Sequence, residues 1–164
     1  MSTATKPARR QLNYQSLEDF SDDVERLASQ PVVTVGNWSF AQILYHLRVV
    51  MIASLDGFPT QLPWIVRRTV GPLMKWYLLK KPMLPAGFKA PKSAQPLMPP
   101  ADADLTQELQ AMRSALERYQ NETPAPEHPI FGKMSKADWD MLHRRHSALH
   151  MSFVVPQSEN CESK

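Results

Sequence analysis

Apolar residues recur along most of the chain with the period of an amphipathic helix. In one segment Phe20, Val24 and Leu27 lie at i, i+4 and i+7, which places them on a single helical face. Residues 105–119 space their apolar side chains by four, three, four and three positions, as a helix in a bundle does. The sequence predicts helices over residues 16–29, 39–56, 63–80, 105–119 and 135–155.

Capping signatures indicate where three of these helices begin. A Ser that caps a helix accepts a hydrogen bond from the backbone N–H three residues later, and an acidic or amide side chain there bonds back to the cap. The pairs with this spacing are Ser16 and Asp19, Ser39 and Gln42, and Ser135 and Asp138. The last helix is expected to run to about Val155, before Pro156 and a polar tail.

Proline-rich stretches separate the predicted helices. The chain holds 15 Pro and five Gly, which favours helices joined by stiff connectors over a turn-rich β fold. Residues 82–100 are expected to be an extended connector, a second Pro-rich loop covers 123–129, and residues 32–35 are extended but too short to seed a sheet. The predicted fold is all-α: a four-helix bundle with an accessory basic helix at 63–80 and Pro-rich crossovers.

Length and composition suit one soluble domain. The 164 residues fall within the usual size of about 100–200 residues per domain, and 43% of them are hydrophobic. We expect a flexible N-terminal arm at residues 1–12, a single domain at 13–156 and a disordered C-terminal tail at 157–164.

Nothing in the sequence predicts a membrane span or an export signal. The longest apolar stretch, residues 43–55, is broken by His46 and Arg48, and a spanning helix needs roughly 20 apolar residues. No apolar region follows Arg9 in the N-terminal arm, and Cys161, as the single cysteine, has no partner for an internal disulfide. These observations favour a cytoplasmic protein.

The charge distribution is uneven although the net charge is only +3. Residues 57–101 contain seven Lys or Arg and no Asp or Glu, with Trp64, Trp76 and Tyr77 among them. Such a segment could contact nucleic acid or an anionic lipid surface, but most basic stretches are simply solvated. No motif of the known nucleic-acid-binding folds is present, so we do not expect nucleic acid as a partner.

Three of the five histidines are candidates for a metal site. His146 and His150 lie one helical turn apart, and His46 lies beside the apolar stripe of the second predicted helix. All three should face the interior, where an unpaired polar group costs about 1–3 kcal/mol. A divalent ion satisfies three imidazoles at once. The predicted ligands are therefore His46, His146 and His150, with Zn, Ni or Fe as the expected ion.

Ordinary structural roles also fit the histidines. An HxxxH pair alone is a weak motif, and a single core histidine such as His46 commonly bonds to a backbone carbonyl. His143, at the edge of the apolar stripe beside Arg144 and Arg145, is expected to be solvated. His128 lies in the second Pro-rich loop, where it is either a turn residue or a gate over a pocket.

Several motifs, taken in order, resemble one superfamily. A capped Trp-Ser start, a His eight residues after Trp38 and a late HxxxH helix resemble the DinB-like (YfiT-like) four-helix-bundle metalloenzymes. More closely, residues 36–47 (Gly-Asn-Trp-Ser-Phe-Ala-Gln-Ile-Leu-Tyr-His-Leu) look like the second-helix motif of a bacterial branch classed as a domain of unknown function. The likeness covers residues 10–156, and further matching segments lie at 56–59, 71–73, 85–88 and 128–135.

The resemblance implies a fold, a ligand set and a chemistry. It implies an up-down-down-up bundle that forms homodimers and holds a metal through His46, His146 and His150. Characterised relatives act on low-molecular-weight thiols such as bacillithiol, mycothiol or glutathione. The sequence departs from the branch at Leu149, where members often carry a second His, but the i, i+4 pair is kept.

A metal-dependent thiol transferase or hydrolase acting on a small molecule is the first functional hypothesis. Three neutral histidines leave the full charge of a divalent ion, which would acidify a bound water or thiol. No Asp or Glu lies near the three histidines in sequence to serve as a general base, which leaves His128 and Tyr45 as candidates. A thiol transferase needs such a base less than a hydrolase does.

A non-catalytic role is the alternative. The three histidines would then bind an ion that stabilises a dimeric bundle, or the chain would be a binding module that uses its basic segment. The sequence leaves the roles of His128, His143 and residues 57–101 open.

Overall fold

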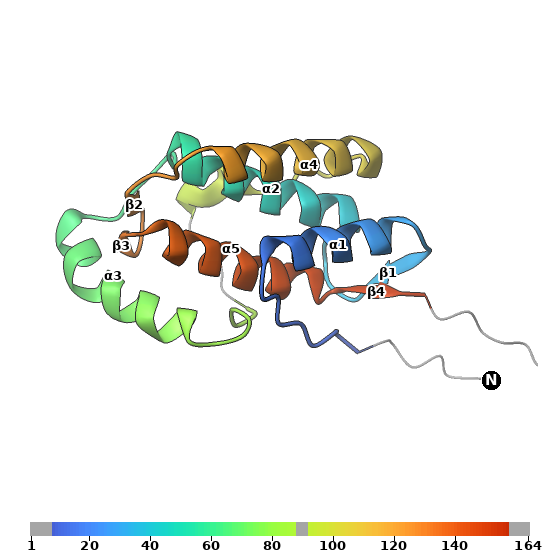
Figure 1. The fold of residues 1–164 in the computed structure, drawn as a ribbon, viewed down its shortest axis with the longest axis horizontal. Coiled ribbons are helices and arrows are strands. Elements are labelled where there is room, and N and C mark those ends of the chain that lie inside the picture. Colours follow the sequence, from blue (N-terminus) through green and yellow to red (C-terminus); the bar gives the residue numbers. More distant parts are fainter. Residues whose placement is uncertain (1–7, 88–91, 158–164) are drawn as a thin grey trace, which may run out of the picture.

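The computed structural model describes residues 8–87 and 92–157 of the chain (Figure 1). Within these residues the protein is mostly helical, which confirms the predicted all-α class. Its helices are α1 (Leu17–Ala28), α2 (Phe40–Asp56), α3 (Trp64–Leu79), α4 (Leu105–Asn121) and α5 (Lys136–Met151), with a short 3₁₀-helix, η1 (Lys92–Leu97). Its strands are β1 (Val32–Thr34), β2 (Glu127–His128), β3 (Gly132–Lys133) and β4 (Val154–Pro156).

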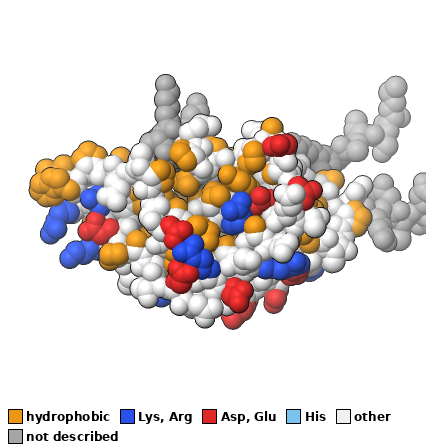
Figure 2. Space-filling view, turned by 90° about the horizontal axis from the view of Figure 1, so that it is seen from above, with side chains coloured by type: hydrophobic (Ala, Val, Ile, Leu, Met, Phe, Trp, Pro, Cys, Tyr) orange, Lys and Arg blue, Asp and Glu red, His pale blue; other side chains and the backbone are white. Residues whose placement is uncertain are grey.

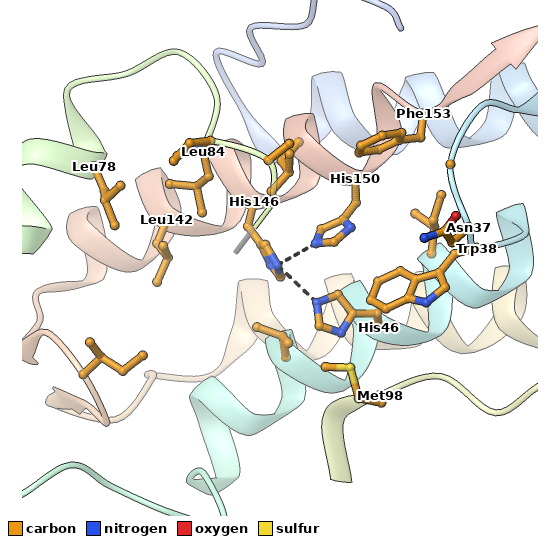
Figure 3. Close-up of a pocket in the computed structure, with 18 of the residues that line it drawn as sticks. Asn37, Trp38, His46, Leu78, Leu84, Met98, Leu142, His146, His150 and Phe153 are labelled. Atoms are coloured by element: carbon orange, nitrogen blue, oxygen red, sulfur yellow. Dashed lines mark hydrogen bonds between the residues drawn. The ribbon is translucent and has the colours of Figure 1, made fainter. Parts of the chain in front are cut away.

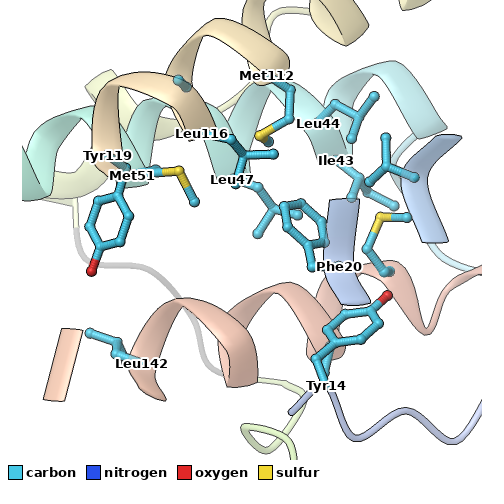
Figure 4. Packing of buried hydrophobic residues seen from close by; sticks show 14 of the residues in the cluster. Tyr14, Phe20, Ile43, Leu44, Leu47, Met51, Met112, Leu116, Tyr119 and Leu142 are labelled. Carbon is cyan, nitrogen blue, oxygen red and sulfur yellow. The ribbon is translucent and has the colours of Figure 1, made fainter. Parts of the chain in front are cut away.

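Four of the helices lie roughly along one axis and share a core. In Figure 1, α1 and α5 run from left to right, whereas α2 and α4 run from right to left. The predicted apolar stripes supply the core: Phe20 of α1, Ile43 of α2, and Met112 and Tyr119 of α4 are all buried (Figure 4). Burying each such side chain stabilises the fold by about 1.5–3 kcal/mol.

The predicted capping boxes are all present. The Ser side chain accepts from the backbone N–H three residues later, and the side chain there bonds back to the cap, at the starts of α1, α2 and α5. Asp104 caps α4 by accepting from the Gln107 N–H at 2.9 Å, which the sequence analysis had not identified. A cap of this kind contributes about 1 kcal/mol.

The predicted end of the last helix was wrong. α5 ends at Met151 instead of near Val155, and the following residues form β4, which pairs antiparallel with β1. Thr34 lies opposite Val154 in this pair, and Val33 lies opposite Val155. The β-branched residues after α5 therefore extend because a distant segment offers them hydrogen-bond partners.

The Pro-rich connector was predicted to be extended, but part of it is helical. Residues 92–97 form the 3₁₀-helix η1, which packs against α2. The carbonyl of Leu97, at the end of η1, reaches the side chain of His46. This segment therefore contributes directly to the environment of a predicted site residue.

α3 is held closely against the hairpin formed by β2 and β3. A Cβ added at Gly71 would lie 2.5 Å from the Ile130 carbonyl oxygen, and one at Gly132 would lie 2.5 Å from that of Arg67. Lys75 of α3 also donates to Asp138 of α5 at 3.0 Å. These contacts fix which face of α3 points inward.

The described part of the predicted N-terminal arm is anchored to the domain. The Arg10 guanidinium donates to both carboxylate oxygens of Asp23, at 2.8 and 2.7 Å, and to the Met151 carbonyl at 2.9 Å. Residues 1–7 and 158–164, the remainder of the arm and nearly all of the predicted tail, lie outside the described residues. None of the described helices has the length and apolar character needed to cross a membrane.

Candidate metal centre

Two helices bring the three predicted ligands together. His46 comes from the middle of α2, and His146 and His150 come from successive turns of α5 (Figure 3). The Nε2 atom of His146 lies 3.2 Å from Nε2 of His46 and 3.1 Å from Nε2 of His150. One ring nitrogen from each histidine falls within 4.8 Å of the other two. The convergence predicted from the sequence is therefore observed.

The ring nitrogens cannot all satisfy one another. The Nδ1 atom of His46 lies 2.8 Å from the Leu97 carbonyl, so Nδ1–H donates to that oxygen and the neutral ring presents a lone pair at Nε2. Nε2 of His146 faces two other nitrogens and carries at most one proton, so it makes at most one of the two close contacts a linear hydrogen bond. The two contacts therefore avoid facing lone pairs or facing protons only when a single His146 proton is shared between the two neighbouring nitrogens, which is weaker than two linear hydrogen bonds.

A divalent cation fits this donor set. Two imidazole nitrogens bound to zinc at about 2.0–2.1 Å with tetrahedral geometry lie about 3.3 Å apart. The observed separations of 3.2 and 3.1 Å are close to that value. The Leu97 carbonyl also orients the His46 ring, as the outer partners of metal-binding histidines commonly do.

Burial keeps all three rings neutral, which is the form that binds a metal. Desolvation lowers the pKa of His46, and it lowers the pKa of His150 to about 3, aided by charge repulsion from His46 and Arg9. The pKa of His146 lies well below its usual value because the ring is desolvated and faces the other histidines. Protons therefore compete weakly for these nitrogens near neutral pH.

Trp38 covers the outer side of the histidine group. Its ring stacks on His150 at a centroid distance of 5.3 Å and an angle of 14°, and its centroid lies 5.0 Å from that of His46 (Figure 3). From the sequence, Trp38 was identified only as part of the start of the second predicted helix and of the resemblance built on it. Trp38 lies one residue before a helix cap and eight residues before a candidate ligand, and this spacing could have indicated that its ring lies near the metal site.

The three histidines line a large pocket. Its volume is about 770 Å³, and its walls come from α2, α3, α5, the 84–87 segment and the hairpin. The lining is mainly apolar, with Leu84, Met98, Leu142 and Phe153 among the residues in view (Figure 3). Among the described residues that line it, none is Asp, Glu, Lys or Arg. The polar groups of the pocket are therefore few, and the histidine cluster dominates them.

His128, which the sequence left open as a turn residue or a gate over a pocket, is a turn residue whose side chain also lines the pocket. Its Nδ1 accepts hydrogen bonds from the backbone N–H groups of Ile130 and Phe131, at 3.0 and 3.2 Å. The ring proton is therefore on Nε2, for which no partner is found within the described part of the chain. Burial lowers the pKa of His128 to about 3, so this Nε2–H is a neutral donor at the pocket.

The expectation of a solvated His143 was wrong. The residue is only 2% exposed, and its Nε2–H donates to the Ser54 hydroxyl at 3.0 Å, which in turn donates to the Met51 carbonyl. Burial lowers its pKa to about 3. α2 packs over this side of α5, and the sequence around His143 gives no sign of it. Tyr45, the other candidate base, is not among the residues lining the pocket.

Comparison with known proteins places the chain in one family. The model of the family described as "Protein of unknown function (DUF1569)" matches residues 6–157. None of the curated proteins and none of the solved structures compared with the chain matches it. Since the family match covers nearly the whole sequence, this chain belongs to the DUF1569 family.

Proposed function

We propose that the chain binds a divalent metal through His46, His146 and His150 and transfers a small thiol to an electrophilic carbon of an apolar substrate, where the new sulfur–carbon bond replaces the bond to a leaving group that departs with the thiol proton. One observation carries this proposal: the three Nε2 atoms converge, 3.1 and 3.2 Å apart, on the wall of a pocket of about 770 Å³. Zn, Ni and Fe all accept three imidazole ligands. The pocket provides room for a ligand beside such an ion.

Thiol chemistry suits this pocket better than hydrolysis. A divalent ion bound by three neutral histidines supplies a Lewis acid that lowers the pKa of a thiol or water beside it. Attack by water is usually assisted by a positioned general base, most often a carboxylate or an unligated histidine. The described lining contains no carboxylate, and both ring nitrogens of His128 are unsuited to the task, because Nδ1 is bonded to the backbone and Nε2 carries the proton. A thiol, which is more acidic than water, requires less help.

The remaining pocket residues bind and orient the substrate. Apolar side chains such as Met74, Leu142 and Phe153 favour an apolar body and exclude water. The Nε2–H of His128 donates a hydrogen bond to an acceptor atom of the substrate, such as a carbonyl oxygen, away from the end that meets the metal. The preferred substrate is therefore largely apolar with one acceptor group.

We further infer that the chain is a DinB-like four-helix bundle with up-down-down-up topology. The directions of α1, α2, α4 and α5 in Figure 1 support this assignment. So does the origin of the histidines, one from the second helix and two from the last helix. The basic helix α3 is then an insertion between the second and third bundle helices.

Cobalt substitution tests the proposed function, because Co²⁺ reports on its ligands through its visible spectrum. We expect the full-length protein to bind one Co²⁺ with the strong absorption of a low-coordinate site. Adding a small alkyl thiol should then produce a sulfur-to-cobalt charge-transfer band. His146→Gln should abolish both signals, while His143→Gln, the same change at a buried histidine outside the cluster, should preserve them.

Two results would count against the proposal in different ways. Cobalt absorption without any response to thiol would reject the thiol substrate and leave the metal site standing. Cobalt absorption that is identical in wild type and His146→Gln would reject the metal site itself.

A further inference from the structure

Exposed apolar side chains gather on one short segment of the molecule. Within the described residues, every large hydrophobic residue that is exposed lies between Leu62 and Tyr77. The group comprises Leu62, Trp64, Ile65, Val70, Leu73, Trp76 and Tyr77. A contiguous apolar patch of this kind marks an interaction surface more often than scattered exposed side chains do.

The patch follows one outward-facing side of α3. Leu73, Trp76 and Tyr77 are spaced by three and four residues, so they lie on one helical face, and they are 66%, 57% and 56% exposed. The opposite side of the helix, at Gly71 and Leu78, is buried against the hairpin and the pocket. α3 is therefore apolar on both sides, and the domain covers only one of them.

Unpaired basic groups lie beside this apolar face. Within the described residues, Arg68, Lys80 and Lys81 form no ion pair. The Lys80 ammonium lies 3.5 Å from the centre of the Trp76 ring, and that of Lys81 lies 4.9 Å from the centre of the Tyr77 ring. In Figure 2, hydrophobic side chains with Lys and Arg beside them gather at the left end of the molecule, where α3 begins in Figure 1.

We propose that the outer face of α3 binds the surface of an anionic phospholipid bilayer. Trp and Tyr rings are enriched at membrane interfaces, where the ring enters the acyl boundary and basic groups meet the lipid headgroups. The combination of Trp76 and Tyr77 with the ammonium groups of Lys80 and Lys81 suits such an interface. α3 would lie along the surface, since no described helix is suited to cross it.

The charges favour a bilayer over a second copy of the chain. Residues 57–101 contain no Asp or Glu, so two copies meeting at α3 would bury Lys80 and Lys81 among like charges. Burying unpaired cations is unfavourable, whereas lipid phosphates neutralise them. Arg67 and Lys75 are already neutralised by Glu127 and Asp138, so only the outward-facing bases remain available for lipid.

Bilayer binding would place the pocket close to apolar compounds dissolved in the membrane. Met74 and Leu78, on the inner side of α3, line the same pocket as the histidines. The proposal goes beyond the metal-dependent function and does not depend on it, because none of the residues of the exposed face is a candidate ligand.

Vesicle co-sedimentation of the full-length protein tests the proposal. We expect binding to phosphatidylcholine vesicles that contain phosphatidylserine, much weaker binding to pure phosphatidylcholine, and loss of binding as salt is raised. The double variant Leu73→Ser, Trp76→Ser should bind more than about tenfold less, since two side chains no longer enter the acyl boundary. Lys80→Gln should weaken binding about fivefold.

Matched controls separate this surface from the rest of the molecule. Arg113→Gln removes an exposed positive charge on α4, where it pairs with Glu25, and should bind vesicles like wild type. His146→Gln should also bind like wild type, whatever its effect on metal. Circular dichroism of each variant reports whether it is folded. If the double variant unfolds, the vesicle binding of Lys80→Gln alone tests the proposal.

Two outcomes would overturn the proposal. The first is equal binding to neutral and anionic vesicles by wild type and Lys80→Gln. The second is the absence of vesicle binding together with a dimer in sedimentation equilibrium that Leu73→Ser, Trp76→Ser converts to a monomer. That second result would assign the face to a second copy of the chain.

Discussion

Two groups of histidines with lowered pKa values lie among α2, α5 and the β2–β3 hairpin, and they differ in what their ring nitrogens face. In the first group, His46, His146 and His150 direct Nε2 atoms at one another, 3.1 and 3.2 Å apart. In the second group, each ring faces a protein partner: His128 accepts from two backbone N–H groups, and His143 donates to the Ser54 hydroxyl.

A lowered pKa does not distinguish the two groups. The pKa is about 3 for His150 in the first group and for His128 and His143 in the second, and desolvation is the main cause for each. The difference is that the Nε2 atoms of the first group converge on one another, whereas Nδ1 of His128 and Nε2 of His143 each bond to another protein group. A buried histidine therefore indicates a metal site when its nitrogen points at other ligands and the protein provides no alternative partner.

The largest expected effect is on zinc affinity. Structural zinc sites bind with about 10–16 kcal/mol over four ligands, so one ligand contributes about 2.5–4 kcal/mol. We expect His146→Gln to weaken zinc binding several hundredfold and His143→Gln to leave it nearly unchanged. Competition titration against a chromophoric chelator measures both. Equal losses of zinc affinity in the two variants would contradict the assignment of the metal to the first group alone.

The next largest effect is a loss of folding stability, and it concerns only the second group of histidines. Ser54→Ala removes the acceptor of the buried His143 Nε2–H, which leaves that donor unpaired at a cost of about 1–3 kcal/mol. Urea unfolding should show the loss of stability, and zinc affinity should not change. A stability equal to that of wild type would mean that the hydrogen bond is not required.

A pH effect should follow from the lowered pKa values. A histidine with a folded-state pKa of about 3 and an unfolded value of about 6.5 makes unfolding easier as pH falls below 6.5, because the unfolded chain binds the proton. Between pH 7.5 and 5.5 this costs about 1.4 kcal/mol per histidine. For the metal-free protein, the loss in unfolding free energy should be about 1.4 kcal/mol smaller in His143→Gln than in wild type.

Urea titrations of both proteins at the two pH values measure this difference. The same loss in wild type and variant would show that His143 titrates normally in the folded protein.

The smallest effect concerns the ring that covers the first group. Trp38→Leu removes the stack on His150 while keeping an apolar side chain. Because groups that support metal ligands commonly affect affinity by about 10–100-fold, and stacking is weaker than a hydrogen bond, we expect a loss near the lower limit, about tenfold. Zinc competition would show it, and unchanged affinity would mean that the ligands hold their orientation without Trp38.

Local patterns were sufficient to predict much of the fold, and together with the family resemblance they predicted the convergence of the first group. The Ser caps and the apolar spacing of α1, α2 and α5 are encoded within a few residues, and the placement of His46 and the His146–His150 pair follows from those helices. Secondary structure determines which face of its helix each of these histidines occupies, but the meeting of α2 and α5 joins residues 100 positions apart.

The features that the sequence did not reveal depend on distant partners. β4 forms because β1 lies beside it, His143 is buried because Ser54 of α2 lies over it, and the Leu97 carbonyl reaches His46 from a segment expected to be extended. Each contact joins residues that are more than 50 positions apart in the sequence. Helical periodicity carries no information about such pairs.

X-ray absorption spectroscopy of the zinc-loaded protein tests the central claim most directly, because it identifies and counts the atoms that bind the metal. We predict a spectrum with three imidazole ligands at about 2.0–2.1 Å, and an added sulfur at about 2.3 Å once a small thiol is present. The three-imidazole signature should be lost in His146→Gln and kept in His143→Gln. A zinc spectrum with fewer than three imidazoles in wild type, or the same spectrum in both variants, would contradict the assignment of His46, His146 and His150 as the metal ligands.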